Sequence, residues 1–142
     1  MVSAQQVAQL LGGQRLVGRR VGNASDLEAA VSAGLKRQSL DHVVEFLAPA
    51  AERAQLRNRI VPRASYQRRA RLNATYSAAT ERLARVAALT RWVWEDDGKA
   101  RAFLNAPHPE LAGRTPLNVA MTELGARQVE ELIDRGLHGL PV

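Results

Sequence analysis

Seven arginines lie between positions 53 and 71, and no acidic residue lies among them. They are Arg53, Arg57, Arg59, Arg63, Arg68, Arg69 and Arg71. A guanidinium group donates hydrogen bonds from a rigid plane, which suits phosphate oxygens and the major-groove edge of guanine. The cluster therefore predicts contact with a polyanion, and DNA is the first hypothesis. The alternatives are a solvated face or a docking site for an acidic partner.

The two halves of the chain differ in charge. Residues 1–75 contain 12 Lys and Arg against 5 Asp and Glu, whereas residues 76–142 contain 8 against 9, so that the whole chain carries +6. A basic half suggests a polyanionic partner, and a nearly neutral half suggests a protein partner.

Residue patterns that would support catalysis or metal binding are missing from the sequence. The chain has no cysteine, and His42, His108 and His138 lie far apart. Glu95, Asp96 and Asp97 adjoin Gly98 but lack the ligand spacing of a calcium loop. Because no phosphate loop, serine elbow or paired general acid and base stands out either, we expect a binding protein with no cofactor, no metal and no enzymatic activity.

The first residues lack a basic leader, and no apolar stretch approaches the roughly 20 residues of a membrane span. We therefore expect a cytoplasmic protein with no membrane partner.

The elements that must position these residues are predicted to be helices, because no run alternates apolar and polar residues as a half-buried strand would. Ser25, with Glu28, is predicted to cap a helix that ends at Gly34, and Ser39 is predicted to cap the next. Further helices are expected at about 50–58, 75–94 and 123–135, the last ended by Gly136. A short helix is expected to begin at residues 96–98, and another to begin at Pro116 with Thr115 as its cap.

The basic region is predicted to be a degenerate helix-turn-helix. The expected DNA-binding residues are Arg63, Ser65, Gln67, Arg68, Arg69 and Arg71, on or beside a short recognition helix. The usual turn glycine is missing between Arg53 and Arg63. This gives three regions: a flexible or docking arm over 1–24, a DNA-binding or dimerising region over 25–74, and a C-terminal domain over 75–142.

The C-terminal sequence resembles the toxin-binding domain of the Xre/MbcA/ParS antitoxins. The segments that carry the resemblance are Gly113-Arg114-Thr115-Pro116-Leu117, Thr122, Gly125 and Val129 to Gly136, with weaker similarity upstream to about Gly34. Two departures are His108, where many relatives have Asn, and Asn118, where an acidic residue is common. The resemblance implies an all-α fold, in which a helix-turn-helix-like bundle is joined by a long helix to a small toxin-binding domain.

The resemblance also implies a partner and a binding segment. The partner would be a RES-domain toxin that consumes NAD or uses it for ADP-ribosylation, and the end of the antitoxin would cover its active site. The implied toxin-binding residues are Arg135, Leu137, His138, Gly139, Leu140, Pro141 and Val142. Operator DNA and a homodimer, or a larger assembly with the toxin, complete the expectation.

A second interpretation is a stand-alone helix-turn-helix transcription regulator whose C-terminal domain only dimerises. The two interpretations differ in whether a toxin is encoded beside this chain.

Overall fold

The computed structural model describes residues 2–137, and this part of the chain is all-α, as the sequence predicts. Its pairing of Lys36 with Arg71 is an isolated bridge, and no strand forms within these residues. The helices in chain order are α1 (Ala4–Leu10), α2 (Gly13–Val17), α3 (Ala24–Ala33), α4 (Arg37–Leu47), the 3₁₀ turn η1 (Ala50–Glu52), α5 (Arg53–Ile60), α6 (Arg63–Arg68), α7 (Ala74–Trp94), α8 (Asp97–Asn105), the 3₁₀ turn η2 (Pro109–Leu111), α9 (Pro116–Val119) and α10 (Glu123–Leu137).

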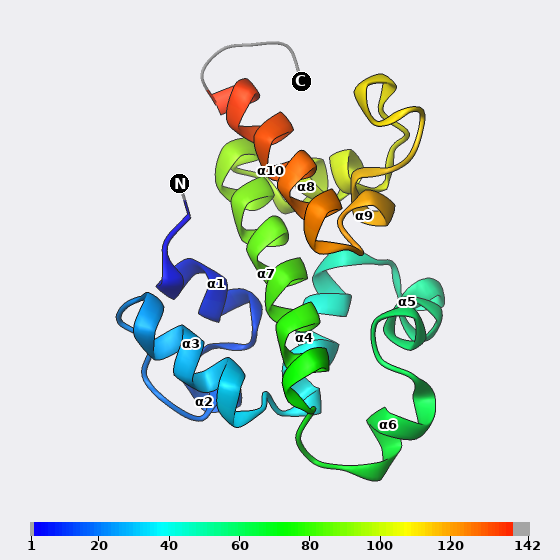
Figure 1. The fold of residues 1–142 in the computed structure, drawn as a ribbon. Helices are drawn as coiled ribbons and strands as arrows, with labels where there is room; N and C mark the ends of the chain where they lie inside the picture. The colour runs from blue at the N-terminus through cyan, green and yellow to red at the C-terminus, as the bar shows by residue number, and fades with distance from the viewer. Residues whose placement is uncertain (1, 138–142) are drawn as a thin grey trace.

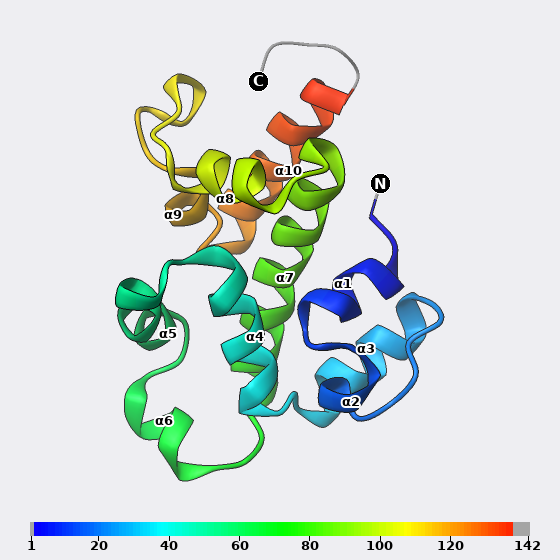
Figure 2. The same ribbon diagram turned by 180° about the vertical axis from the view of Figure 1, so that it is seen from behind.

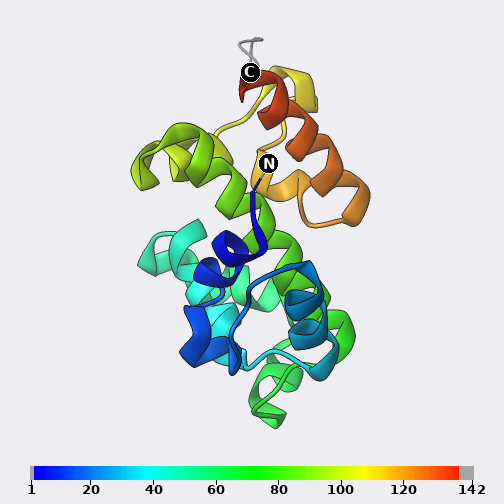
Figure 3. The ribbon, with the colours of Figure 1, turned by 90° about the vertical axis from the view of Figure 1, so that its left-hand side faces the viewer.

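Helix α7 runs through the centre of the molecule (Figure 1). Leu83, Ala84, Val86 and Ala87 are almost completely buried along it, which confirms the long amphipathic helix that the sequence predicts. Helices α1, α3 and α4 contact α7, and α8 and α10 contact it too. The side view shows the N-terminal helices around one end of α7 and α8 to α10 around the other (Figure 3). One helix therefore belongs to both halves of the core.

The N-terminal segment, predicted as a flexible or docking arm over 1–24, instead contributes buried side chains to the core. Val7, Leu10 and Leu11 are buried, and α1 and α3 lie against α7. Gly12 and Gly13 adopt φ values of 101° and 75°, a left-handed region open to glycine, and so let the chain fold back between α1 and α2.

Three of the predicted helix ends are wrong. Asn23, not Ser25, caps α3, because its side chain accepts a hydrogen bond from the Asp26 amide at 2.9 Å. Ser39 lies inside α4 and is buried, since α4 already begins at Arg37, beside the bridge to Arg71. Gly136 does not end α10, which continues to Leu137.

Other predicted ends are confirmed. Gly34 ends α3, α8 begins within residues 96–98, and the Thr115 hydroxyl caps α9 ahead of Pro116. Seen from behind, α4 lies along the lower part of α7, with α5 and α6 beyond it (Figure 2). Within the described residues, no helix combines the length and apolar character needed to cross a membrane.

Candidate functional site

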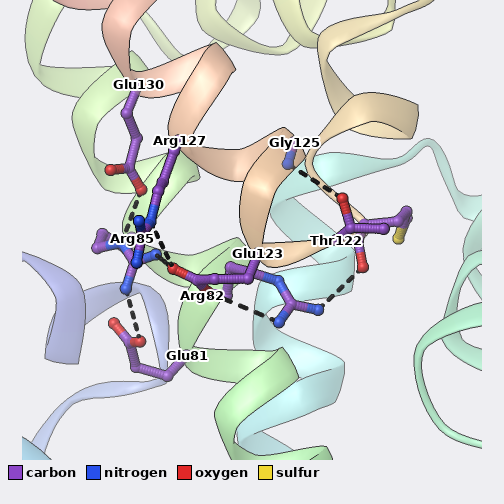
Figure 4. Close-up of polar contacts among 9 residues, drawn as sticks. Glu81, Arg82, Arg85, Thr122, Glu123, Gly125, Arg127 and Glu130 are labelled. Carbon is purple, nitrogen blue, oxygen red and sulfur yellow. Dashed lines mark hydrogen bonds and ion pairs between the residues drawn. The ribbon is translucent and has the colours of Figure 1, made fainter.

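Helix α10 is joined to α7 by a network of charged side chains (Figure 4). The Arg85 guanidinium lies at its centre and donates to Glu130 at 2.7 Å and to Glu81 at 3.1 Å. It also lies 3.5 Å from Glu123 at the start of α10. One side chain of α7 therefore contacts acids on both the first and second turns of α10.

This network is only partly open to solvent. The Arg85 side chain is 30% exposed, Glu81 17% and Glu130 26%, so the charges interact more strongly than a surface pair would. Burial raises the pKa of the Glu81 carboxyl, although the Arg85 charge partly opposes that rise. Burial alone would lower the pKa of Arg85, but its bond to Glu130 and the neighbouring acids outweigh that effect and raise it.

A second set of contacts fixes the turn between α9 and α10. Arg82 donates to the Met121 carbonyl at 2.9 Å, and the Thr122 hydroxyl accepts from the Gly125 amide at 3.0 Å, which caps α10. Gly125 is buried, and a Cβ at this position would overlap the Val119 carbonyl oxygen. The Thr122 and Gly125 of the family-like motif therefore have a structural role in this turn.

The loop before α9 is held against the far end of α10. Its own backbone is closed by hydrogen bonds between His108 and Gly113 and between His108 and Arg114. Glu110 of this loop accepts from Arg135 at 2.9 Å. Arg135, predicted to bind toxin, thus already has an intramolecular partner, but 42% of its side chain remains exposed.

The rest of the predicted toxin-binding segment lies at or beyond the end of the described residues. Leu137 is the last residue of α10. His138, Gly139, Leu140, Pro141 and Val142 lie outside the described residues.

Two large apolar side chains are exposed on α7 and α10. Leu124 is 75% exposed on the first turn of α10, and Trp92 is 40% exposed near the end of α7. Trp94, two residues on, is half-buried with its ring centroid 4.5 Å from that of Phe103. Helical spacing could have identified Leu124, because it is out of phase with the buried Val129, Leu132 and Ile133.

Some arginines of the basic cluster contact neighbouring groups of the fold, and others are exposed to solvent. Arg53 donates to the Ala48 carbonyl at 3.0 Å, and Arg57 lies 3.6 Å from Asp41. The sequence analysis found no local acid to neutralise this cluster, but the fold brings Asp41 of α4 to it. Arg63, Arg68 and Arg69 are exposed at α6 and its C-terminal end.

Helix α6 is short and is held chiefly through Tyr66. The Tyr66 hydroxyl donates to Asp41 at 2.7 Å, and the Arg57 guanidinium lies 4.6 Å from the centre of its ring. Burial, followed by the hydrogen bond to Asp41, raises the pKa of Tyr66. Helices α5 and α6 meet at Val61-Pro62, a tight turn without glycine. The helix-turn-helix assignment and its DNA contacts stay predictions.

The six predicted DNA-binding residues are not brought to a single place. Ser65, Arg68, Arg69 and Arg71 line one hollow beside the start of α7. Arg63 and Gln67 line another hollow, between α5 and α6. Within the described residues, no group of three His, Asp or Glu side chains is arranged to hold a metal ion.

Comparison with known families finds a match in the C-terminal region. Residues 88–139 match the family model described as the antitoxin Xre/MbcA/ParS C-terminal toxin-binding domain. The match covers the end of α7 and α8 to α10, which is less of the chain than the sequence resemblance suggested. A search of curated proteins found no match to the chain. The family match supports an antitoxin role.

Proposed function

We propose that this protein is the antitoxin of a type II toxin–antitoxin system and that its partner is a RES-domain toxin. The observation that carries the proposal is the family match over residues 88–139, within which the helices around the end of α7 lie. The proposed activity is binding rather than catalysis, and its proposed location is the cytoplasm, where an NAD-consuming toxin would act.

We place the inhibiting segment at Leu137 to Val142, with Arg135 at its base. The contacts of Arg85 with Glu123 and Glu130 fix α10, and the Glu110–Arg135 pair fixes its last turns, so the segment starts from a defined point. We propose that this segment docks in the active-site cleft of the toxin. Apolar side chains would add buried area there, and Pro141 would limit the entropy lost on docking.

Truncation after Gly136 is expected to abolish neutralisation. The test is co-expression of the chain with the protein encoded beside it, with growth and intracellular NAD measured. The full chain should restore both and the truncated chain neither, because only the truncated chain leaves the toxin's active site open. A full-length Leu140→Asp variant should also fail, since it keeps the segment's length but puts a charge where apolar area is needed.

Two results would count against this assignment. If the truncated chain unfolds at the same temperature as the full chain and still neutralises, the inhibiting segment lies elsewhere on the C-terminal domain. If the neighbouring protein is harmless without this chain, the antitoxin role fails. The stand-alone regulator whose C-terminal domain dimerises then takes its place.

We further propose that the basic half binds the operator of the same operon, as a homodimer or within a larger complex with the toxin. Support comes from the exposed arginines at and after α6. Substituting both Arg68 and Arg69 by Ala should weaken binding to operator DNA and lower the salt slope by about two, since each lost phosphate contact removes roughly 0.9. Binding is measured by fluorescence anisotropy at several salt concentrations. Neutralisation should persist in this variant. Its loss would contradict the proposal that one half of the chain binds DNA and the other binds the toxin.

A further inference from the structure

The hollow beside the start of α7 is lined mainly by basic and polar residues. Three arginines and Ser65 contribute to its wall, and Leu72, Asn73 and Tyr76 complete it; no acidic residue is among them. Its volume is about 170 Å³, several times the roughly 30 Å³ share of one water molecule. It can therefore admit a small anion together with part of its hydration shell.

One of these arginines is fixed in place by the backbone. Arg71 donates to the Gly34 carbonyl at 2.9 Å, and the segment that carries it pairs with the chain around Lys36, where the Leu72 amide donates to the Leu35 carbonyl at 2.8 Å. Gly34 allows this close approach, because a Cβ there would lie 2.7 Å from the Leu72 carbonyl oxygen. The Arg71 guanidinium has more donors than this one bond uses, which leaves others for a ligand.

Arg68 and Arg69 are exposed and contribute from the end of α6. Together with Arg71 and the Ser65 hydroxyl, these two arginines give the hollow positive charge and hydrogen-bond donors. This is the chemistry that binds phosphate oxygens, which accept several charge-assisted hydrogen bonds at once. The start of α7 lies beside the hollow, and the helix dipole there adds a modest favourable contribution.

The second hollow has a different character. Arg63 and Gln67 line it together with Ala54, Arg57, Asn58 and Tyr66. Arg57 there is already engaged by Asp41 and by the Tyr66 ring. The two hollows share no lining residue, so the predicted DNA-binding residues form two independent sets.

We infer that Ser65, Arg68, Arg69 and Arg71 form a discrete site for a single phosphate group. The inference rests on the proposed DNA binding, because the phosphate group that the site would bind is a backbone phosphate of the operator. Such a site fixes the position of the protein along the duplex and is indifferent to base sequence. Arg63 and Gln67 lie outside it and do not share this role.

The test compares Arg69→Gln with Arg63→Gln, which removes the same charge from the other hollow. Titration of the full chain with inorganic phosphate, followed by NMR shifts of backbone amides, should give saturable shifts around residues 65–73. Arg69→Gln should reduce the phosphate affinity several-fold and Arg63→Gln should leave it unchanged. Ser65→Ala, which keeps all charges, should also weaken phosphate binding.

A second arm uses duplex DNA. Arg69→Gln should lower affinity for operator and unrelated duplexes by the same factor, roughly tenfold at 0.1 M salt, and reduce the salt slope by about one. Equal effects of Arg69→Gln and Arg63→Gln in both arms would overturn the site. If the unsubstituted chain binds no duplex but binds phosphate through Arg69, the operator half of the proposed function fails while the phosphate site stands with a free phosphate as its ligand.

Discussion

Replacing Arg85 by Met should lower the free energy of unfolding by about 2 to 3 kcal/mol, measured by urea denaturation at pH 7.5. The substitution keeps much of the apolar stem but leaves Glu81 and Glu130, both mostly buried, without their shared cation. Removing one partner of a fully buried pair costs about 3 to 5 kcal/mol, and the partial exposure of this network reduces that figure.

Arg127→Met is the matched control within the same network. Arg127 contacts Glu123 at 3.6 Å, but its side chain is 67% exposed. An exposed pair of this kind contributes about 0.5 kcal/mol or less, so the control should unfold almost like the unsubstituted chain. Equal destabilisation by the two substitutions would mean that Arg85 acts only through general charge and not through its position between the helices.

The defect of Arg85→Met should also depend on pH. The pKa of Glu81 in the folded chain already lies above its ordinary value of 4.5, and loss of the Arg85 charge removes an influence that lowers it. The folded state of the variant therefore binds protons more readily than the unfolded state, so its stability falls as pH rises. Between pH 7.5 and a pH near 4.5, the difference from the unsubstituted chain should shrink; a constant difference would exclude Glu81 as the cause.

Local sequence signals predicted most of the helices, because their causes lie within a few residues. The Thr115-Pro116 cap, the start of α8 and the apolar stripe of α7 all arise from neighbours on the same helix. The Ser25 cap was wrong because Asn23 caps α3 instead. The Ser39 cap was wrong because α4 already begins at Arg37, next to the bridge between Lys36 and Arg71, a residue far along the sequence. Such long-range contacts leave no local signature.

The candidate site was harder to predict for the same reason. Residue types indicated a basic surface, but their division into two hollows depends on the placement of α6, which Asp41 of α4 sets through Tyr66. The charged network likewise joins Arg85 to Glu130, 45 positions away. Composition can suggest which chemistry is present, but only the fold determines which side chains line the same hollow.

The network also joins residues that precede the family match to helices within it. The match begins at Ala88, whereas Arg82 and Arg85, which hold the first turns of α10, precede it. A fragment cut at Ala88 would lose both contacts and much of the α7 surface beneath α10. Helices α7 to α10 therefore pack as one structural unit.

Gly125→Ala should lower the free energy of unfolding by about 2 kcal/mol and the melting temperature by about 6 °C. The added Cβ would overlap the Val119 carbonyl oxygen and lie 2.8 Å from the Val119 carbonyl carbon, so the backbone of α9 or α10 must move. Alanine is intrinsically better than glycine in a helix by about 1 kcal/mol, which offsets part of the cost but cannot relieve contact with a backbone atom.

Gly98→Ala supplies the control, since Gly98 lies in the first turn of α8, is exposed, and its added Cβ would meet only the Asp96 carboxylate at 3.2 Å. That variant should melt at or slightly above the temperature of the unsubstituted chain, because alanine restricts the unfolded state. Calorimetry of the three chains decides the matter. If Gly125→Ala instead melts at the same temperature as Gly98→Ala, the close approach of α9 to α10 is not what requires glycine at position 125. If Gly125→Ala melts well below Gly98→Ala and also loses neutralisation, the turn between α9 and α10 sets the orientation of α10 that neutralisation requires.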